Sequence, residues 1–534
     1  MRPRKSYIMK TDIQYGFKRI GIGAMKSFSA FASEKIASLR LTPRRGLFLA
    51  LTAASAAWIL QYALLQKMVG LDVVEALNWG LQGDVWGNIK HPPLSGWIAL
   101  FFYRLSGGAD WGLYLAAQAC VWAGVLFTWR LARLFWDEYK AVTSALLLCF
   151  LYYYVPSPMK FSTFFVEMAL MPAVAWAFFR AMRRKDLLSY ALLGILCGLG
   201  VLNKYSIALL FLSVAVVMLI EPEYRRELAT WRPYFALGIF LLVIAPHLHY
   251  LVTHDFCCIT HMGHRMEESH IRFAPVLVFI TAAAPAGCAA LVLSAAFLFR
   301  SGKSEPAAPD RRVFRWSLIF CALPAVIFLI ASFCGENVIM LWFSSLASFT
   351  GIMVVAACPR RIDEKVFRNL CCFLAIYMAV WFIGTGYQLL FKSNHRAHTE
   401  PQAITVPVFD FWARESKGQP LHLVAGDRWY GGIMTLYSGI SPRLCEIHKE
   451  LGEHWRRGFL DQINDKGALI IGSREENFDD FAKAFREKYG YSIDLSRRIT
   501  YTYKAPFGKR RERSFVVGRI PPKAERMKTP KNQQ

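Results

Sequence analysis

Residues 47–65 read LFLALTAASAAWILQYALL, nineteen positions without one charged side chain. A straight helix needs ~20 such residues to cross the apolar core of a bilayer, so this stretch predicts a membrane-spanning helix. Ten further apolar runs follow it. They lie at residues 112–131, 141–154, 166–179, 187–202, 207–220, 234–251, 276–299, 316–333, 339–357 and 370–390. The pattern predicts a polytopic α-helical membrane protein with about eleven transmembrane helices.

The composition agrees with a membrane protein. Of 534 residues, 55% are hydrophobic, above the ~45–50% of soluble domains. The formal net charge is +25, a value that in a soluble protein would suggest nucleic acid as a partner. Here the Lys and Arg side chains gather in loops between the apolar runs, and membrane topology accounts for them there. We therefore expect membrane lipids and no nucleic acid among the partners.

The basic loops also predict which way the chain crosses the membrane. Lys and Arg concentrate in cytoplasmic loops because they resist translocation. Residues 94–105 form an apolar run of only twelve positions, which suits a juxtamembrane helix that does not cross. On that assumption every second loop is basic. The basic positions are Arg130, Arg133, Lys140, Arg180, Arg183, Arg184, Lys185, Arg225, Arg226, Arg232, Arg300, Lys303, Arg311, Arg312, Arg315, Arg360, Arg361, Lys365 and Arg368. The N-terminus is then cytoplasmic and the C-terminal region lies outside.

The sequence divides into four parts. Residues 1–45 form a basic cytoplasmic segment, residues 46–391 a transmembrane domain whose first outer loop is 66–111, and residues 392–520 a soluble region. Short strand-like and helical runs alternate in the soluble region, which indicates a small α/β domain. The strand-like runs are 421–425, 443–447, 468–471 and 514–517, and the helical runs are 432–438, 455–463 and 478–489. The basic residues 521–534 are predicted to be a disordered tail.

Cysteine and histidine spacings predict no metal centre. The twelve cysteines include no CxxC pair, and most lie inside apolar runs. Six histidines between His247 and His270 suggest zinc, but their spacing matches no zinc-enzyme motif. We expect this loop to contact substrate or to lie at the membrane interface, and we expect no cofactor.

Two carboxylates just beyond the first apolar run are candidate catalytic groups. Asp72 and Glu75 are three residues apart, so they share one side of a helix. A carboxylate at an apolar boundary is costly unless it is paired or used. A general base for a hydroxyl acceptor needs such a group within hydrogen-bond reach. The alternative is an exposed loop with helix-capping acids.

Several basic residues near the same membrane face are candidate phosphate ligands. Lys90 and His91 precede Pro92-Pro93, which starts a helix, and a helix start attracts anions. Lys204, next to Tyr205, stands between two apolar runs, where it either pairs with a lipid phosphate or snorkels to the interface. Lys160 lies in the second outer loop, where a solvated structural charge is the simpler interpretation.

These motifs occur in an order that resembles a known family. The first loop reads LDVVEALNWG at 71–80 and KHPPLSGW at 90–97, with GLGVLNKY at 198–205 and APHLHYLVTHDFCCITH at 245–261. RAMRR at 180–184 and VAGDRWYGGIMTLY at 424–437 also fit. The chain resembles the GT-C glycosyltransferases of family 39, the dolichyl-phosphate-mannose–protein mannosyltransferase-like group. The likeness is to the bacterial branch of lipid A aminoarabinose and galacturonic acid transferases.

Two departures from the family pattern affect the acidic residues. Many relatives have adjacent Asp-Glu in the first loop, whereas here Asp72 and Glu75 are three apart, and Asp72 takes the family's aspartate position. Many relatives also carry an Asp in the second outer loop. Here residues 160–163 read KFST, and Glu167 is the acidic residue nearby. A second acidic role is therefore in doubt.

The resemblance implies an inverting glycosyltransferase in a bacterial inner membrane, acting on the periplasmic face without a metal or other cofactor. It implies a polyprenyl-phosphate-linked sugar donor and a lipid or glycolipid acceptor, with lipid A preferred. Asp72, with Glu75, would activate the acceptor. The donor phosphate and substrate would contact Lys90, His91, Lys204, Tyr205, Lys160 and His261. Protein O-mannosylation, transport and lipid flipping are the competing functions.

Overall fold

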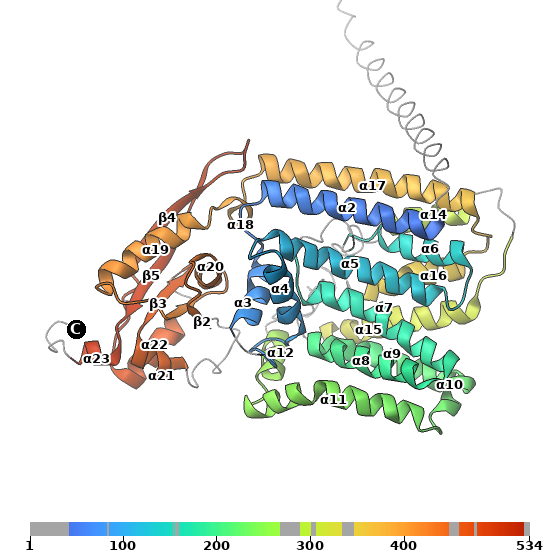
Figure 1. The fold of residues 1–534 in the computed structure, drawn as a ribbon, viewed down its shortest axis with the longest axis horizontal. Helices are drawn as coiled ribbons and strands as arrows, with labels where there is room; N and C mark the ends of the chain where they lie inside the picture. The colour runs from blue at the N-terminus through green and yellow to red at the C-terminus, as the bar shows by residue number, and fades with distance from the viewer. Residues whose placement is uncertain are drawn as a thin grey trace, which may run out of the picture.

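Long apolar helices lie side by side as one bundle in the computed structural model (Figure 1). The structure describes residues 42–82, 85–152, 154, 160–267, 289–300, 306–333, 346–447, 459–474 and 478–527. Six described helices are long and apolar enough to cross a membrane. They are α2 (Pro43–Leu65), α5 (Trp111–Ala132), α7 (Thr163–Arg184), α11 (Arg232–Thr253), α15 (Arg311–Phe333) and α17 (Glu364–Phe391). The predicted polytopic helical fold is thereby confirmed.

Shorter helices account for the other predicted spans, wholly or in part. They are α6 (Glu138–Leu148), α8 (Leu187–Asn203), α9 (Ala208–Ile220), which follows the 3-10 turn η1 (Tyr205–Ile207), α14 (Ala289–Arg300) and α16 (Thr350–Ala357), which follows the 3-10 turn η4 (Leu346–Phe349). The first parts of the runs predicted at 276–299 and 339–357 lie outside the described residues. From Ala141 to Leu148, every residue of α6 is buried, so this helix lies inside the bundle.

Small residues allow two of the helices to approach closely. A Cβ atom added at Gly194 of α8 would lie 2.4 Å from the carbonyl oxygen of Ala236 in α11. One added at Gly198 would lie 2.5 Å from a methyl carbon of Val243. Glycines four residues apart are a common device for close helix packing in membranes, where lipid removes the hydrophobic driving force between helices.

Two short helices lie crosswise at one end of the bundle (Figure 1). The first, α3 (Leu71–Leu81), follows α2 after a short link, and the second, α4, spans Leu94–Leu105, as the sequence predicted for the juxtamembrane helix. Pro93 is the N-cap of α4, so the two prolines fix the backbone where this helix begins. The crosswise arrangement agrees with a helix that lies along a membrane surface.

The C-terminal region is an α/β domain at this same end of the bundle (Figure 1). Its strands follow the order β2-β1-β3-β5-β4, with β1 parallel to β2 and β3, and β5 antiparallel to β3 and β4. The strands are β1 (Leu423–Gly426), β2 (Arg443–Glu446), β3 (Ala468–Gly472), β4 (Arg497–Tyr503) and β5 (Arg511–Ile520). The helices are α18 (His395–His398), α19 (Gln402–Glu415), α20 (Tyr430–Tyr437), α21 (Phe459–Lys466) and α22 (Asp479–Tyr489).

Sequence patterns predicted the α/β class but missed three of these elements, namely the four-residue α18, strand β4 and helix α19. Strand β4 has the burial pattern of an edge strand, with mostly exposed or half-buried side chains, so it lacks the apolar signal of a buried strand. Helix α19 was also missed, and a proline lies inside it at position 407, which weakens a helical pattern.

The first residues of the segment predicted to be a disordered tail, residues 521–527, are ordered. Residues Lys523–Arg526 form a helical turn, α23. The guanidinium of Arg519 donates a hydrogen bond of 3.0 Å to Glu525, and Arg526 donates to the Asn464 side chain. These contacts order residues that a basic composition marked as disordered. Residues 528–534, like residues 1–41, lie outside the described part of the chain.

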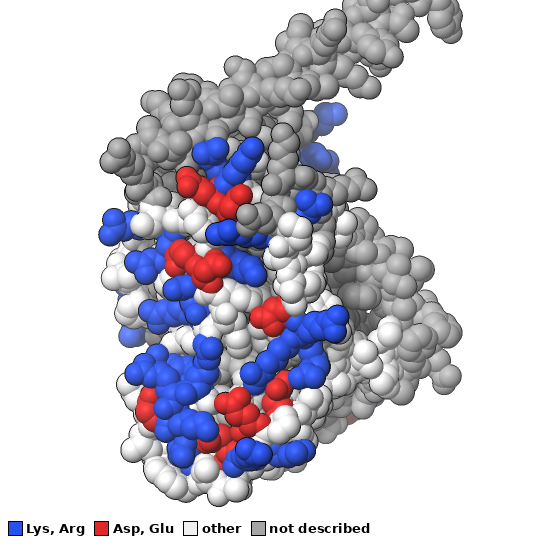
Figure 2. Space-filling model, turned by 90° about the vertical axis from the view of Figure 1, so that its right-hand side faces the viewer, with Lys and Arg blue, Asp and Glu red and all other residues white. Residues whose placement is uncertain are grey.

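Lys and Arg side chains gather at the end of the bundle opposite the α/β domain (Figure 2). Helices α5 and α7 end there, and α15 and α17 begin there (Figure 1). The loops that the sequence predicted to be cytoplasmic therefore meet at one end of the molecule. The positive-inside rule assigns a basic end to the cytoplasm, and the α/β domain would then lie on the other side.

We predict that a reporter enzyme active only outside the cytoplasm is active when fused after Pro521 and inactive when fused at Asp363. The two positions lie at opposite ends of the bundle, so opposite activities are expected if the long helices cross the membrane. The measurement is reporter activity in whole cells, normalised to the amount of fusion protein. Activity at Asp363, or none after Pro521, would contradict this topology.

Candidate active site

Asp72 lines a large polar cavity. The residue lies in the first turn of α3, where the helix dipole favours a carboxylate. The cavity has a volume of about 720 Å³. Side chains of α2, α17, the α18 segment, Tyr503 of β4 and Lys160 complete its walls. The cavity therefore lies between the helical bundle and the C-terminal domain.

Basic side chains line the same cavity as Asp72. Lys160, Lys392 and Arg396 line the cavity together with His395. Burial, followed by the charge of Arg513 and then of Arg396, lowers the pKa of His395 to about 4, so this imidazole is neutral at pH 7. The cavity walls thus carry three cations and a single carboxylate, an arrangement that suits an anionic ligand.

The protonation of Asp72 reflects both burial and charge. Burial raises the pKa of Asp72, and the carboxylate of Glu75 raises it further, while Lys160, Arg428 and Arg396 act in the opposite direction. The side chain is exposed to the open cavity although protein surrounds it. A carboxylate with a raised pKa is a stronger base than a free aspartate once it has lost its proton.

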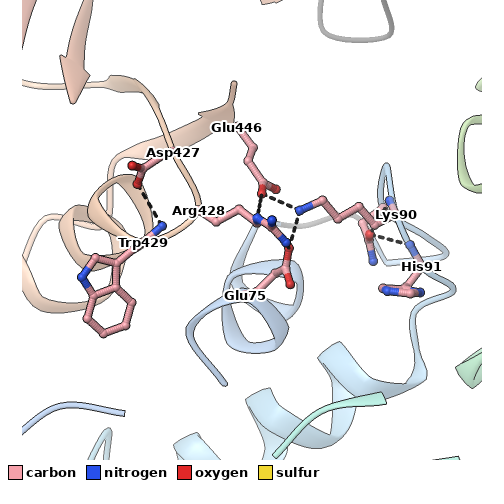
Figure 3. Close-up of polar contacts among 8 residues, drawn as sticks. Glu75, Lys90, His91, Asp427, Arg428, Trp429 and Glu446 are labelled. Carbon is pink, nitrogen blue, oxygen red and sulfur yellow. Dashed lines mark hydrogen bonds and ion pairs between the residues drawn. The ribbon is translucent and has the colours of Figure 1, made fainter. Parts of the chain in front are cut away.

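Glu75 belongs to a separate cluster of four charged side chains that are largely but not fully buried (Figure 3). The Lys90 ammonium donates hydrogen bonds to the carboxylates of Glu75 and Glu446, at 2.6 Å in the second case. The Arg428 guanidinium lies 3.6 Å from the same Glu75 oxygen and 3.7 Å from the same Glu446 oxygen. Only 3% of the Lys90 side chain is exposed. The cluster joins the first loop to the C-terminal domain.

The cluster holds Glu75 in its ionised form. Burial acts to raise the pKa of Glu75, but the charges of Lys90 and Arg428 outweigh burial and lower the pKa to about 2. Burial raises the pKa of Glu446, and Lys90 and Arg428 only partly offset it. Glu75 does not line the large cavity with Asp72. The predicted catalytic pair is therefore separated, and Lys90 is occupied by carboxylates rather than free to bind phosphate.

His91 lies at the turn before α4, beside the charge cluster (Figure 3). The side-chain oxygen of Asn88 accepts hydrogen bonds of 2.9 Å from the backbone N–H groups of Lys90 and His91. Burial lowers the pKa of His91 to about 3, with further lowering by Lys204, His261 and Lys90 against the opposing effect of Glu75. Three of the other predicted basic residues therefore influence the pKa of His91.

Lys204 and Tyr205 are held by contacts within the bundle. The ammonium of Lys204 lies 3.5 Å from the carboxylate of Glu167, and the hydroxyl of Tyr205 lies 2.7 Å from Nε2 of His247. Glu167 therefore pairs with Lys204. Lys160, by contrast, lines the large cavity together with Asp72. Among the remaining loop histidines, His270 and the side chain of His264 lie outside the described part.

The described side chains include no group of three His, Cys, Asp or Glu that could hold a metal ion.

Sequence reasoning missed the residues that the C-terminal domain and its linker contribute: Lys392, His395, Arg396, Arg428, Glu446 and Tyr503. Arg428 and Glu446 lie far from residue 90 along the chain, so no local spacing could connect them. The one available signal was the GDRWYGG stretch at 426–432, part of the run at 424–437 that contributes to the family resemblance.

The sequence of this chain is similar to those of known glycosyltransferases. Residues 90–250 match the family model for dolichyl-phosphate-mannose-protein mannosyltransferase. The chain is 26% identical over 275 residues to the lipopolysaccharide core galacturonosyltransferase RgtA of Rhizobium johnstonii. That alignment covers 49% of this chain and 54% of RgtA, so the chain spans about half the length of this curated relative.

The structural comparison extends over nearly the whole chain. A crystal structure of ArnT from Cupriavidus metallidurans bound to undecaprenyl phosphate aligns with a TM-score of 0.58, covering 89% of this chain and 97% of that chain. The apo form of the same protein aligns with a TM-score of 0.56. Sequence identity is 14% in both, so this likeness establishes a shared fold.

We predict that Lys90→Met lowers the free energy of unfolding by ~3–5 kcal/mol, because it leaves the buried carboxylates of Glu75 and Glu446 without their ammonium partner. The measurement is thermal unfolding of the purified protein in detergent. Lys67→Met is the matched control, since Lys67 pairs with Glu400 at 2.9 Å with both side chains half exposed, and such pairs contribute ~0–1 kcal/mol. Equal effects of the two substitutions would show that the cluster does not stabilise the protein.

Proposed function

We propose that the chain is a GT-C membrane glycosyltransferase similar to ArnT and RgtA. In this proposal it transfers a sugar from a polyprenyl-phosphate carrier to an envelope glycolipid on the periplasmic face of a bacterial inner membrane. The observation that carries this proposal is the large cavity, in which Asp72 faces several cations. The proposed side of the membrane rests on the basic end of the bundle lying opposite the α/β domain.

In the proposed reaction Asp72 acts as the general base. Its carboxylate accepts the proton of an acceptor hydroxyl while the hydroxyl oxygen forms a bond to C1 of the sugar. The bond between C1 and the phosphate oxygen breaks, and its electron pair leaves with the phosphate. Lys160 and Arg396, on the cavity wall, stabilise the charge on the departing phosphate. A single displacement inverts the configuration at C1.

The cavity walls also suit a lipid-linked donor. Tyr62 of α2 and Trp381 of α17 line the cavity where it meets the bundle, so a polyprenyl chain would extend along apolar helices while its phosphate meets the basic wall. The fold neighbour ArnT was solved with undecaprenyl phosphate, which supports this donor class. A phosphate ester is already a leaving group, so the reaction needs no nucleotide.

The charge of the cavity favours an acidic sugar over a cationic one. Lys160, Lys392 and Arg396 would repel the ammonium group of aminoarabinose, whereas a uronic acid adds a carboxylate that these side chains can bind. The name of RgtA, a lipopolysaccharide core galacturonosyltransferase, supports the same choice. We therefore propose a uronic acid as the sugar and the lipid A–core region as the acceptor.

Protein mannosylation is the competing function, favoured by the description of the matching family model. The two functions differ in the product that a deletion strain loses. Mass spectrometry of envelope lipids and of secreted proteins should show one sugar missing from a lipid species and no change in protein glycans. Unchanged lipids with a missing protein glycan would replace our proposal with the protein-modifying function.

We predict that Asp72→Asn lowers kcat/KM for sugar transfer by ~10²–10⁴-fold, because the amide keeps the shape of the side chain and removes the base. Burial and Glu75 raise the pKa of Asp72, so the activity of the unaltered enzyme should fall on acidification above the usual pKa of an aspartate. Asp410→Asn, at an exposed position of α19, is the matched control. The assay is transfer by purified protein in lipid. A loss of only a few-fold would rule out Asp72 as the base.

We predict that Lys160→Ala raises the KM for the lipid-linked donor by about tenfold or more, since a charge-assisted hydrogen bond contributes ~1.5–3 kcal/mol. Lys204→Ala should have a smaller effect on donor KM, because Lys204 pairs with Glu167 and does not line the cavity. The donor KM of each variant is measured from initial rates at varied donor concentration. A larger effect at Lys204 would place the donor phosphate at the His91 turn instead.

A further inference from the structure

A second cavity lies further along α3, against the C-terminal domain. Its volume is about 60 Å³, enough for about four water molecules at ~10–15 Å³ each. Its lining residues are Glu75, Asn78, Trp79, Gln82, Asn88, Ile89, Lys90, Arg428, Arg443, Leu444, Glu446 and Phe459. The four-charge cluster, which Figure 3 draws, contributes Glu75, Lys90, Arg428 and Glu446 to this lining.

Two buried amide side chains on the wall lack partners. Neither the side-chain oxygen nor the nitrogen of Asn78 has a hydrogen-bond partner in the described part of the protein, and the same holds for the nitrogen of Asn88. Their exposed fractions are 4% and 5%. A buried polar atom without a partner is costly. Both side chains line the cavity, so a polar ligand in it can supply the missing contacts.

The remaining wall groups narrow the chemistry of that ligand. Glu75 and Glu446 disfavour a phosphate, and Lys90 and Arg428 disfavour a metal cation. Trp79 and Phe459 add aromatic surface, and the guanidinium of Arg443 lies 5.4 Å from the centre of the Phe459 ring. Paired donors and acceptors beside aromatic rings match a molecule with adjacent hydroxyl groups on an apolar ring face.

We infer that this cavity is part of a saccharide subsite, in which hydroxyl groups at one edge of the sugar enter the cavity and bond Asn78, while Trp79, Phe459 and Arg443 border the rest of the ring. The inference rests on the proposed function in one respect, that the saccharide belongs to the acceptor. Asp72 and Asn78 are six residues apart on one helix, ~9 Å along its axis.

The test uses the full chain in lipid nanodiscs and delipidated lipopolysaccharide core oligosaccharide as the probe. Saturation-transfer NMR should detect contact between the unaltered protein and the ring protons of the saccharide. Asn78→Leu should weaken binding by roughly tenfold, because it keeps the volume but removes both polar atoms. Thr435→Val on the facing helix α20 is the control, since Thr435 is buried and hydrogen-bonded but does not line the cavity.

A second variant tests the subsite independently, so that the test does not depend on whether Asn78→Leu folds. Arg443 is exposed at the mouth, and Arg443→Ala should also weaken saccharide binding and raise the acceptor KM while leaving the donor KM unchanged. No saccharide contact with the unaltered protein, or full binding by both variants, would overturn the subsite even if sugar transfer is found. Binding that depends on Asn78 in a protein without transferase activity would support the subsite and refute the proposed function.

Discussion

The contact between Lys90 and the carboxylates of Glu75 and Glu446 determines how the two parts of the molecule meet. One carboxylate belongs to the first loop and the other to strand β2. Burying one ammonium between two carboxylates is costly unless further charges complete the cluster, and Arg428 completes it. Breaking any partner leaves an uncompensated buried charge, so the cluster specifies one position of the C-terminal domain on α3.

The large cavity depends on that position. Its walls come from α2 and α17 on one side and from residues 392–398 and Tyr503 on the other. Gly432 of α20 packs so closely on α3 that an added Cβ would lie 2.4 Å from a methyl carbon of Val74. Two contacts therefore hold α3, which carries Asp72, against the C-terminal domain: the charge cluster at Glu75 and the close packing of Gly432 on Val74. Asp72 and the cations that face it come from separate elements that only this docking brings together.

The distribution of charge also explains why one face of the molecule carries the polar chemistry. Lys and Arg side chains on the opposite end satisfy the rule for cytoplasmic loops, and Figure 2 shows how densely they cover it. The cations of the large cavity are not explained by that rule. They lie beside one carboxylate in a site partly shielded from water, where charges interact more strongly than at an exposed surface.

The sequence by itself determined the membrane fold, the bounds of the short helix at Leu94–Leu105, the α/β class of the C-terminal domain and the candidate residue Asp72. These features follow from local properties, since apolar run length, charge asymmetry between loops and proline at a helix start are all read from neighbouring positions. Only the tertiary structure decided that Glu75 and Lys90 are structural partners of Glu446, and that Lys160 and Arg396 face Asp72. The physical reason is that a charge is stabilised by whatever lies beside it in space, and these partners are separated by up to several hundred residues along the chain.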